Sequence, residues 1–91
     1  MGYALTEDIR FSDGRLFDLN FDTYNIPVFS MLPRIETVLV DNPDLPPKGG
    51  GEPAIIGIGG AIATAIHDAT GAVLHQQPMT PERVGEALQK I

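Results

Sequence analysis

The sequence predicts a small α+β fold, in which a β-hairpin and further strands form a small sheet that is packed by two helices. Three observations lead to this prediction. Apolar and polar residues alternate near the N-terminus, an Asp-Gly pair interrupts that alternation, and the last third of the chain has helical periodicity. The 91 residues suffice for one small domain, so residues 1–91 are expected to form a single unit with a thin stability margin.

Alternation near the N-terminus predicts the first two strands. From Tyr3 to Ser12, apolar residues share one parity and most polar residues share the other, which is typical of a half-buried strand. Asp13-Gly14 can fill both positive-φ positions of a type I′ turn, and a strand over residues 15–18 should return antiparallel. Glu7 breaks the alternation, and a carboxylate at a strand edge is the favoured interpretation.

Two further strands are expected. Residues 34–41, RIETVLVD, carry apolar side chains on most of both faces, which indicates a central or well-covered strand. Residues 72–78 are a short strand candidate. Residues 20–33 contain two prolines and no sustained period, so they should form an extended segment held by aromatic anchors. The expected anchors are Phe21, Tyr24 and Phe29.

Apolar residues at steps of three and four predict helices over about 57–70 and 80–90. Gly71 should close the first in the left-handed conformation, and its glycines at 57, 59 and 60 should allow a close approach to a neighbouring element. The second begins with Thr80 as N-cap and Pro81 at the first helical position. Its expected apolar stripe is Val84, Ala87, Leu88 and Ile91.

Composition excludes several classes of function. Twelve acidic residues stand against six basic ones, which gives a net charge of −6 and argues against a nucleic-acid partner. Without cysteine there is no thiolate zinc site and no cysteine-ligated iron–sulfur cluster. The longest weakly polar run, from Pro53 to Ile66, is shorter than the roughly 20 residues that cross a bilayer, and the N-terminus lacks the features of a secretory signal. We therefore expect no membrane partner and a cytoplasmic location.

The stretch NPDLPPKGGGEP, residues 42–53, is a loop with one carboxylate, Glu52, between three glycines and Pro53. A phosphate-binding loop is disfavoured, because the stretch ends neither in Gly-Lys-Ser/Thr nor in a dinucleotide-binding turn, and a carboxylate repels phosphate. Two interpretations stay open. The loop is a flexible connector with Glu52 solvated, or its glycines bring the backbone against a large flat group and Glu52 is a general base beside it.

Other polar residues give no site. His67 and His75 are eight positions apart and lack the spacing of a metal pair, so solvated or capping histidines are favoured and no metal ligand is assigned. Serine occurs only at Ser12 and Ser30, and neither lies in a nucleophile-elbow setting.

Four stretches, taken in order, resemble a known family. They are MGYALTED…DGRLFDLNFDTYNIP, PRIETVLVD, KGGGEPAIIGIGGAIATAIHDATG and QQPMTPERV. Together, over about residues 2–88, they resemble the C-terminal portion of the large subunit of the molybdenum hydroxylases, the xanthine dehydrogenase and aldehyde oxidase family. The most specific piece is the Lys-Gly-x-Gly-Glu-Pro motif, which Lys48 to Pro53 satisfy.

The resemblance implies an oxidoreductase that hydroxylates an aldehyde or an N-heterocycle. Glu52 would be the active-site base beside a molybdenum–pterin cofactor, and Gly50 and Gly51 would lie against that cofactor. Family large subunits are several times longer and hold the cofactor mostly through upstream residues. The isolated chain is therefore expected to bind no cofactor and to be inactive.

The partners implied by the resemblance are the remainder of a molybdenum hydroxylase large subunit and, beyond it, iron–sulfur and flavin subunits. The alternative is a non-catalytic stand-alone domain that forms a homo-oligomer or binds a protein partner. A short chain with a marginal core, and with surfaces that a full subunit would bury, motivates this second hypothesis.

Overall fold

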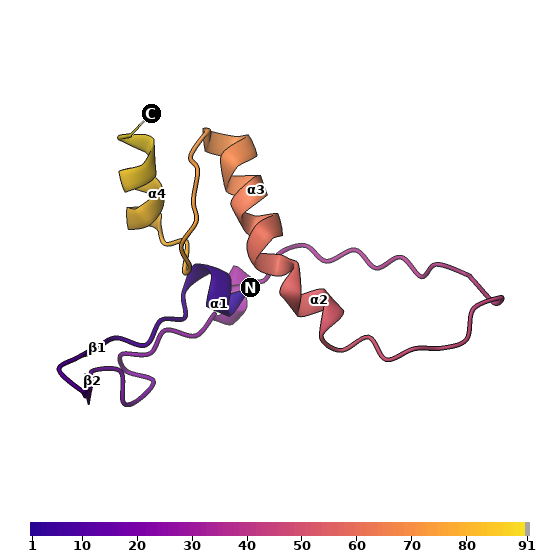
Figure 1. Ribbon diagram of the computed structural model, residues 1–91, viewed down its shortest axis with the longest axis horizontal. Helices are drawn as coiled ribbons and strands as arrows, with labels where there is room; N and C mark the ends of the chain where they lie inside the picture. The colour runs from indigo at the N-terminus through magenta and orange to yellow at the C-terminus, as the bar shows by residue number, and fades with distance from the viewer. Residues whose placement is uncertain (91) are drawn as a thin grey trace.

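A short helical turn at the N-terminus lies where the other parts of the molecule meet (Figure 1). The computed structural model describes residues 1–90. Their radius of gyration, 17.1 Å, exceeds the roughly 12 Å of a compact domain of this length. The elements, in order, are α1 (Gly2–Leu5), β1 (Phe11–Ser12), β2 (Arg15–Leu16), a 3₁₀ helix η1 (Phe29–Met31), α2 (Pro53–Ile56), α3 (Ile58–Thr70) and α4 (Pro81–Leu88). The predicted α+β class is confirmed.

Few side chains of the described residues are buried. Ala4 and Ala72 are fully buried, Met79 is nearly so, and α1 packs against α3. The Met79 amide donates a hydrogen bond to the Ala4 carbonyl at 2.7 Å. This bond ties the segment before α4 to the N-terminal turn. Many large apolar side chains outside this core remain exposed, so the chain alone buries little of its apolar surface.

The predicted hairpin is confirmed. Phe11 pairs with Leu16 and Ser12 with Arg15 in an antiparallel ladder. Asp13 and Gly14 have φ values of 49° and 74°, the positive values that a type I′ turn requires. β2 ends at Leu16, two residues before the predicted end.

Arg10 and Asp18 close the open end of the hairpin. The Arg10 amide donates to Asp18 Oδ2 at 2.6 Å, and Arg10 Nη2 lies 2.5 Å from Asp18 Oδ1. The Asp18 side chain is fully covered. Hydrogen bonds from the Arg10 guanidinium and amide lower the pKa of Asp18 from 3.8 to about 2.

The strand predicted from Tyr3 to Ser12 is confirmed only at its last two residues, Phe11 and Ser12, and is wrong before them. The amides of Ala4 and Leu5 donate to the Met1 carbonyl, which closes a helical turn. No strand of residues 1–90 lies beside this stretch to pair with it, so its polar backbone groups are satisfied locally. Glu7 is not on a strand edge, because no strand includes it. Its carboxylate accepts a hydrogen bond from the Tyr24 hydroxyl at 2.7 Å. That bond raises the pKa of Tyr24.

The strands predicted over residues 34–41 and 72–78 are also wrong for the chain as it stands. Both stretches run as coil, and within residues 1–90 the only sheet is the two-stranded hairpin. Val38 and Leu39 are 85% and 90% exposed. A strand is stable only when a neighbour accepts and donates its ladder hydrogen bonds, and these residues offer no such neighbour.

The aromatic anchors predicted in residues 20–33 are mostly wrong. Phe21 and Phe29 are highly exposed, whereas Tyr24 is half-buried. The rings of Phe21 and Tyr24 meet edge to face, with centroids 6.4 Å apart. The two phenylalanines are thus not anchors within the described residues.

Both predicted long helices are confirmed. α3 ends at Gly71, whose φ is 80° and whose amide donates to the His67 carbonyl. α4 begins after Thr80, whose side chain accepts a hydrogen bond from the Arg83 amide. Of the apolar stripe on α4, Val84 and Ala87 are half-buried, Leu88 is exposed and Ile91 lies outside the described residues.

Of the three glycines expected to allow close packing, only Gly59 does so. A Cβ at Gly59 would overlap the side-chain amide of Gln77, whereas positions 57 and 60 have nothing within 4 Å. The short α2 comes directly before this helix.

Gly59→Ala and Gly60→Ala form a matched pair on α3. Gly60→Ala should raise the free energy of unfolding by about 0.5–1 kcal/mol, because Ala favours the helix and the site is open. Gly59→Ala should raise the free energy of unfolding by less than Gly60→Ala does, or lower it, because the new Cβ would overlap the Gln77 side chain and displace it. Thermal unfolding of the two variants and the original chain tests this, and equal midpoints for the variants would contradict it.

The hairpin closure should depend on pH in one direction. The folded-state pKa of Asp18 is depressed from 3.8 to about 2. The contribution of its carboxylate to hairpin stability is therefore complete above pH 3.8 and is lost as the pH falls towards about 2. NMR shifts of Phe11 and Leu16 between pH 5 and pH 2 should report opening of the ladder. Asp18→Asn should remove this dependence, while Asp22→Asn should keep it; a pH response that survives in Asp18→Asn refutes the assignment.

Candidate functional site

The predicted base, Glu52, lies at the N-terminal end of α2, in the turn that follows the glycine run. Its carbonyl accepts hydrogen bonds from the amides of Ile55 at 2.9 Å and Ile56 at 3.4 Å. Pro53 occupies the first helical position and fixes the local backbone. The Glu52 side chain is exposed and makes no capping hydrogen bond. The backbone is therefore held by the helical turn, while the carboxylate faces outward.

The glycine run leaves one side of its backbone open. Gly49, Gly50 and Gly51 are exposed, and none has an atom within 4 Å of where a Cβ would lie. A large group could approach Gly50 and Gly51 without meeting side chains. They form the C-terminal end of the long loop that projects from the rest of the molecule in Figure 1.

These residues fit one wall of a cofactor site but do not enclose one. The glycine backbone and the Glu52 carboxylate supply a face that a bulky group can contact. Along residues 1–90, no three His, Asp or Glu side chains gather in a way that could hold a metal ion. The ligands and the remaining walls of such a site would have to come from other polypeptide.

A tyrosine that the sequence did not single out anchors this wall. The Tyr3 hydroxyl donates a hydrogen bond to the Ile55 carbonyl in α2. α2 also packs against α3. The bond joins residues 52 positions apart, so nothing in the local sequence around either partner could have predicted it. Tyr3 therefore fixes α2, and with it the backbone of Glu52, to the N-terminal turn.

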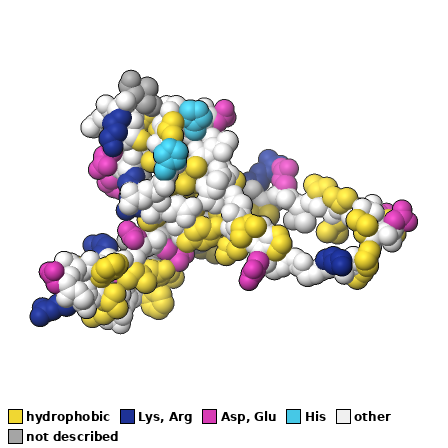
Figure 2. All heavy atoms as spheres, in the orientation of Figure 1, with side chains coloured by type: hydrophobic (Ala, Val, Ile, Leu, Met, Phe, Trp, Pro, Cys, Tyr) yellow, Lys and Arg dark blue, Asp and Glu magenta, His cyan; other side chains and the backbone are white. Residues whose placement is uncertain are grey.

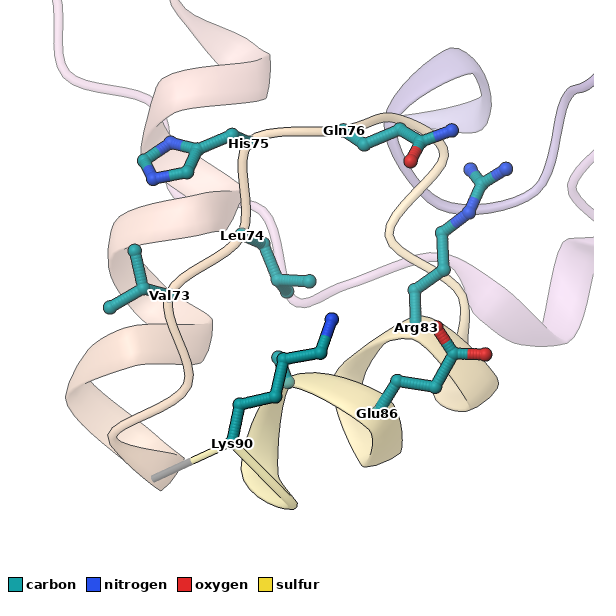
Figure 3. A pocket seen from close by; sticks show the side chains of 8 residues that line it. Val73, Leu74, His75, Gln76, Arg83, Glu86 and Lys90 are labelled. Atoms are coloured by element: carbon teal, nitrogen blue, oxygen red, sulfur yellow. The ribbon is translucent and has the colours of Figure 1, made fainter.

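An open cavity of about 460 Å³ lies elsewhere, between α4 and the segment before it (Figure 3). Arg83 and Glu86 reach it from α4, and Lys90 from the turn that follows α4. Arg83 is already engaged, because Nη1 donates to the Pro78 carbonyl at 2.6 Å and Nη2 lies 3.6 Å from Asp8 Oδ2. Glu52 does not line this cavity. The remaining residues that line the cavity are Val73, Leu74, His75, Gln76 and Ala87.

The two histidines are exposed, as predicted. His67 lies in the last turn of α3, and both rings border one shallow cavity beside that helix. The other residues of the cavity are Ala, Gly, Thr, Val and Leu, so no carboxylate adds to the pair. Nothing here resembles a complete metal site.

Comparison with known proteins reveals relatives that are oxidoreductase subunits. The chain is 37% identical over 85 residues to a nicotinate dehydrogenase subunit of Pseudomonas putida, a match that covers 93% of this chain and 7% of that protein. It is 33% identical over 96 residues to a probable xanthine dehydrogenase subunit of Bacillus subtilis, and the match covers 99% of this chain and 13% of that protein. It is 31% identical over 98 residues to the aldehyde oxidoreductase molybdenum-binding subunit PaoC of Escherichia coli, and the match covers 100% of this chain and 13% of that protein. No protein-family model matches.

The relatives define the class as molybdenum-dependent dehydrogenases and oxidases. Within that class, this chain belongs to the xanthine dehydrogenase and aldehyde oxidase family and corresponds to a fragment of its molybdenum-binding large subunit. It spans only 7 to 13% of the length of these relatives. Along residues 1–90, none of the helices has the length and apolar character needed to cross a membrane.

Tyr3→Phe should loosen α2 without unfolding the chain. Loss of one hydrogen bond costs about 0.5–1.5 kcal/mol, and the released turn should exchange the Ile55 and Ile56 amides faster with solvent. Hydrogen–deuterium exchange measures this. Tyr24→Phe is the matched control, because it removes a hydroxyl that bonds to Glu7 rather than to α2. Unchanged exchange at Ile55 in Tyr3→Phe would show that the bond does not hold α2.

Proposed function

We propose that this chain supplies the active-site base, Glu52, to a molybdenum-dependent hydroxylase that is completed by other polypeptide. The observation that carries the proposal is the position of Glu52. Its backbone is fixed at the start of α2, directly after an open glycine backbone, and its side chain is exposed. A general base requires this combination, a held position and access to a reacting group.

The exposed apolar surface supports a larger assembly. Ile35, Leu39 and Ile56 lie more than two-thirds exposed, although such side chains normally contribute to a core. Figure 2 displays apolar side chains over the hairpin and along the projecting loop as well as around α2. Exposed groups of apolar side chains of this kind mark contact surfaces for other protein.

The role assigned to this chain is limited to its own residues. Glu52 would accept a proton from the reacting oxygen, and the backbone of Gly50 and Gly51 would let the bulky cofactor come close. The molybdenum–pterin cofactor, held mainly by the rest of the subunit, would supply the redox chemistry. The hydroxylated substrate would be an aldehyde or an N-heterocycle, since the relatives are named for an aldehyde, for xanthine and for nicotinate.

The same exposed surface favours a second candidate, a non-catalytic domain that associates with itself. The two candidates differ in what they require of Glu52. A self-associating module needs no carboxylate at this position, whereas the hydroxylase fragment depends on it.

Glu52→Gln in the assembled enzyme should lower turnover by about 10²–10⁴-fold, because the amide keeps the shape of the side chain but cannot accept the proton. Steady-state oxidation of an aldehyde and of an N-heterocycle would measure this. Asp44→Asn is the matched control, since it neutralises another exposed carboxylate of the same loop and should leave turnover unchanged. Full activity in Glu52→Gln would reject the role of Glu52 as the base.

A further inference from the structure

The stretch from Arg34 to Val40, named here the 34–40 segment, is extended and wholly exposed. From residue 33 to residue 41, no backbone group bonds to another backbone group within residues 1–90. Ile35 is 72% exposed and Val40 is 85% exposed. The segment forms one edge of the projecting loop in Figure 1, and Figure 2 places apolar side chains along that loop. Its backbone donors and acceptors are thus available to another chain.

The side chains of the segment already alternate as they would in a strand. Arg34 Nη2 and Glu36 Oε1 form an ion pair at 2.6 Å. An extended backbone places residues two positions apart on the same side. Arg34, Glu36, Val38 and Val40 therefore share one face, and Ile35, Thr37 and Leu39 share the other.

Composition adds a preference for pairing. Ile35, Thr37, Val38 and Val40 are β-branched, and such residues favour a pleated surface packed by neighbours. Both faces carry large apolar side chains, which is typical of a strand that is covered on both sides. An extended peptide with these properties binds by adding itself to the edge of a sheet.

We propose that the 34–40 segment pairs, as a strand, with a sheet edge of the remainder of the molybdenum-binding subunit. This shares with the proposed function the premise that such a remainder exists, but it does not depend on the role of Glu52. The relatives support this occupant, because 87 to 93% of their length lies outside the region that matches this chain.

A second copy of the chain is a poorer occupant. Antiparallel pairing of two copies about Thr37 would put Arg34 opposite Val40 and Glu36 opposite Val38, which sets charged side chains against apolar ones. Parallel pairing in register would put Glu36 opposite Glu36, and like charges directly across a ladder are destabilising. A strand from different polypeptide can instead present apolar residues to Val38 and Val40.

Hydrogen–deuterium exchange of the full chain tests the pairing. The probe is the PaoC subunit of Escherichia coli, shortened by the region that matches this chain and co-expressed with it. In the free chain the 34–40 amides should exchange at nearly the unprotected rate; in the complex they should slow by at least about a hundredfold. A complex in which these amides stay unprotected overturns the proposal, and so does failure of the two polypeptides to co-purify.

Two proline variants sharpen the test, since successive N–H groups of a strand point to opposite edges. Val38→Pro and Leu39→Pro each remove one donor, from opposite edges, and at least one should weaken complex formation by tenfold or more, on the order of one lost ladder bond. Val38→Ile, which keeps the N–H and the β-branch, should bind as the original chain does. The exchange of α3 amides in the free variants shows that the fold is retained.

Binding by both proline variants at full strength would overturn the pairing. Concentration-dependent protection of residues 34–40 in the chain alone would replace the proposed occupant with a second copy. Neither amide exchange nor complex formation measures turnover. These experiments can therefore reject the strand pairing without rejecting Glu52 as the base, and the Glu52→Gln experiment can reject the base without rejecting the pairing.

Discussion

The hydrogen bond from the Met79 amide to the Ala4 carbonyl ties the C-terminal third of the described chain to its N-terminal turn. It joins the segment that leads into α4 to the single turn of α1, where Ala4 is fully buried and Met79 is nearly so. A buried backbone group must find a partner, so this contact defines where the C-terminal third of the chain can lie. Everything else in the molecule extends outward from that small centre (Figure 1).

The position of Glu52 depends on the same centre. Tyr3, in α1, donates to the Ile55 carbonyl, and the first turn of α2 bonds back to the Glu52 carbonyl. The loop from residue 32 to residue 51 has few backbone hydrogen bonds of its own. At its C-terminal end its position is therefore set by α2. An N-terminal turn therefore fixes a carboxylate about fifty residues later, through two hydrogen-bonded steps.

Features that depend on a few neighbouring residues were predictable. The Asp13-Gly14 turn, the Thr80 cap and the Gly71 helix end each follow from local backbone requirements, and all three are confirmed. The resemblance of the Lys48 to Pro53 motif identified the family, and the relatives confirm it. The place of Glu52 beside a cofactor stays a prediction, because this chain forms only one wall of such a site.

Features that depend on distant residues were not predictable. α1 replaces part of the expected first strand, and the Tyr3 contact with Ile55 leaves no local signal. The strand expected over residues 34–41 has the right alternation and composition, yet it has no neighbour to pair with. Here the pattern describes a preference of the segment, and whether the strand forms depends on polypeptide outside this chain.

Folding and assembly should therefore be coupled in this molecule. A radius of gyration of 17.1 Å and a core of three small or flexible side chains leave the free chain with little apolar burial to offset its conformational entropy. A partner that binds only the folded chain adds stability in proportion to the logarithm of its concentration over Kd, about 2.7 kcal/mol at a hundredfold excess over Kd. That increment is a large share of what a small domain has in total. The surfaces that the free chain leaves exposed are thus the surfaces through which assembly would stabilise it, and the backbone that carries Glu52 would become rigid in the same step.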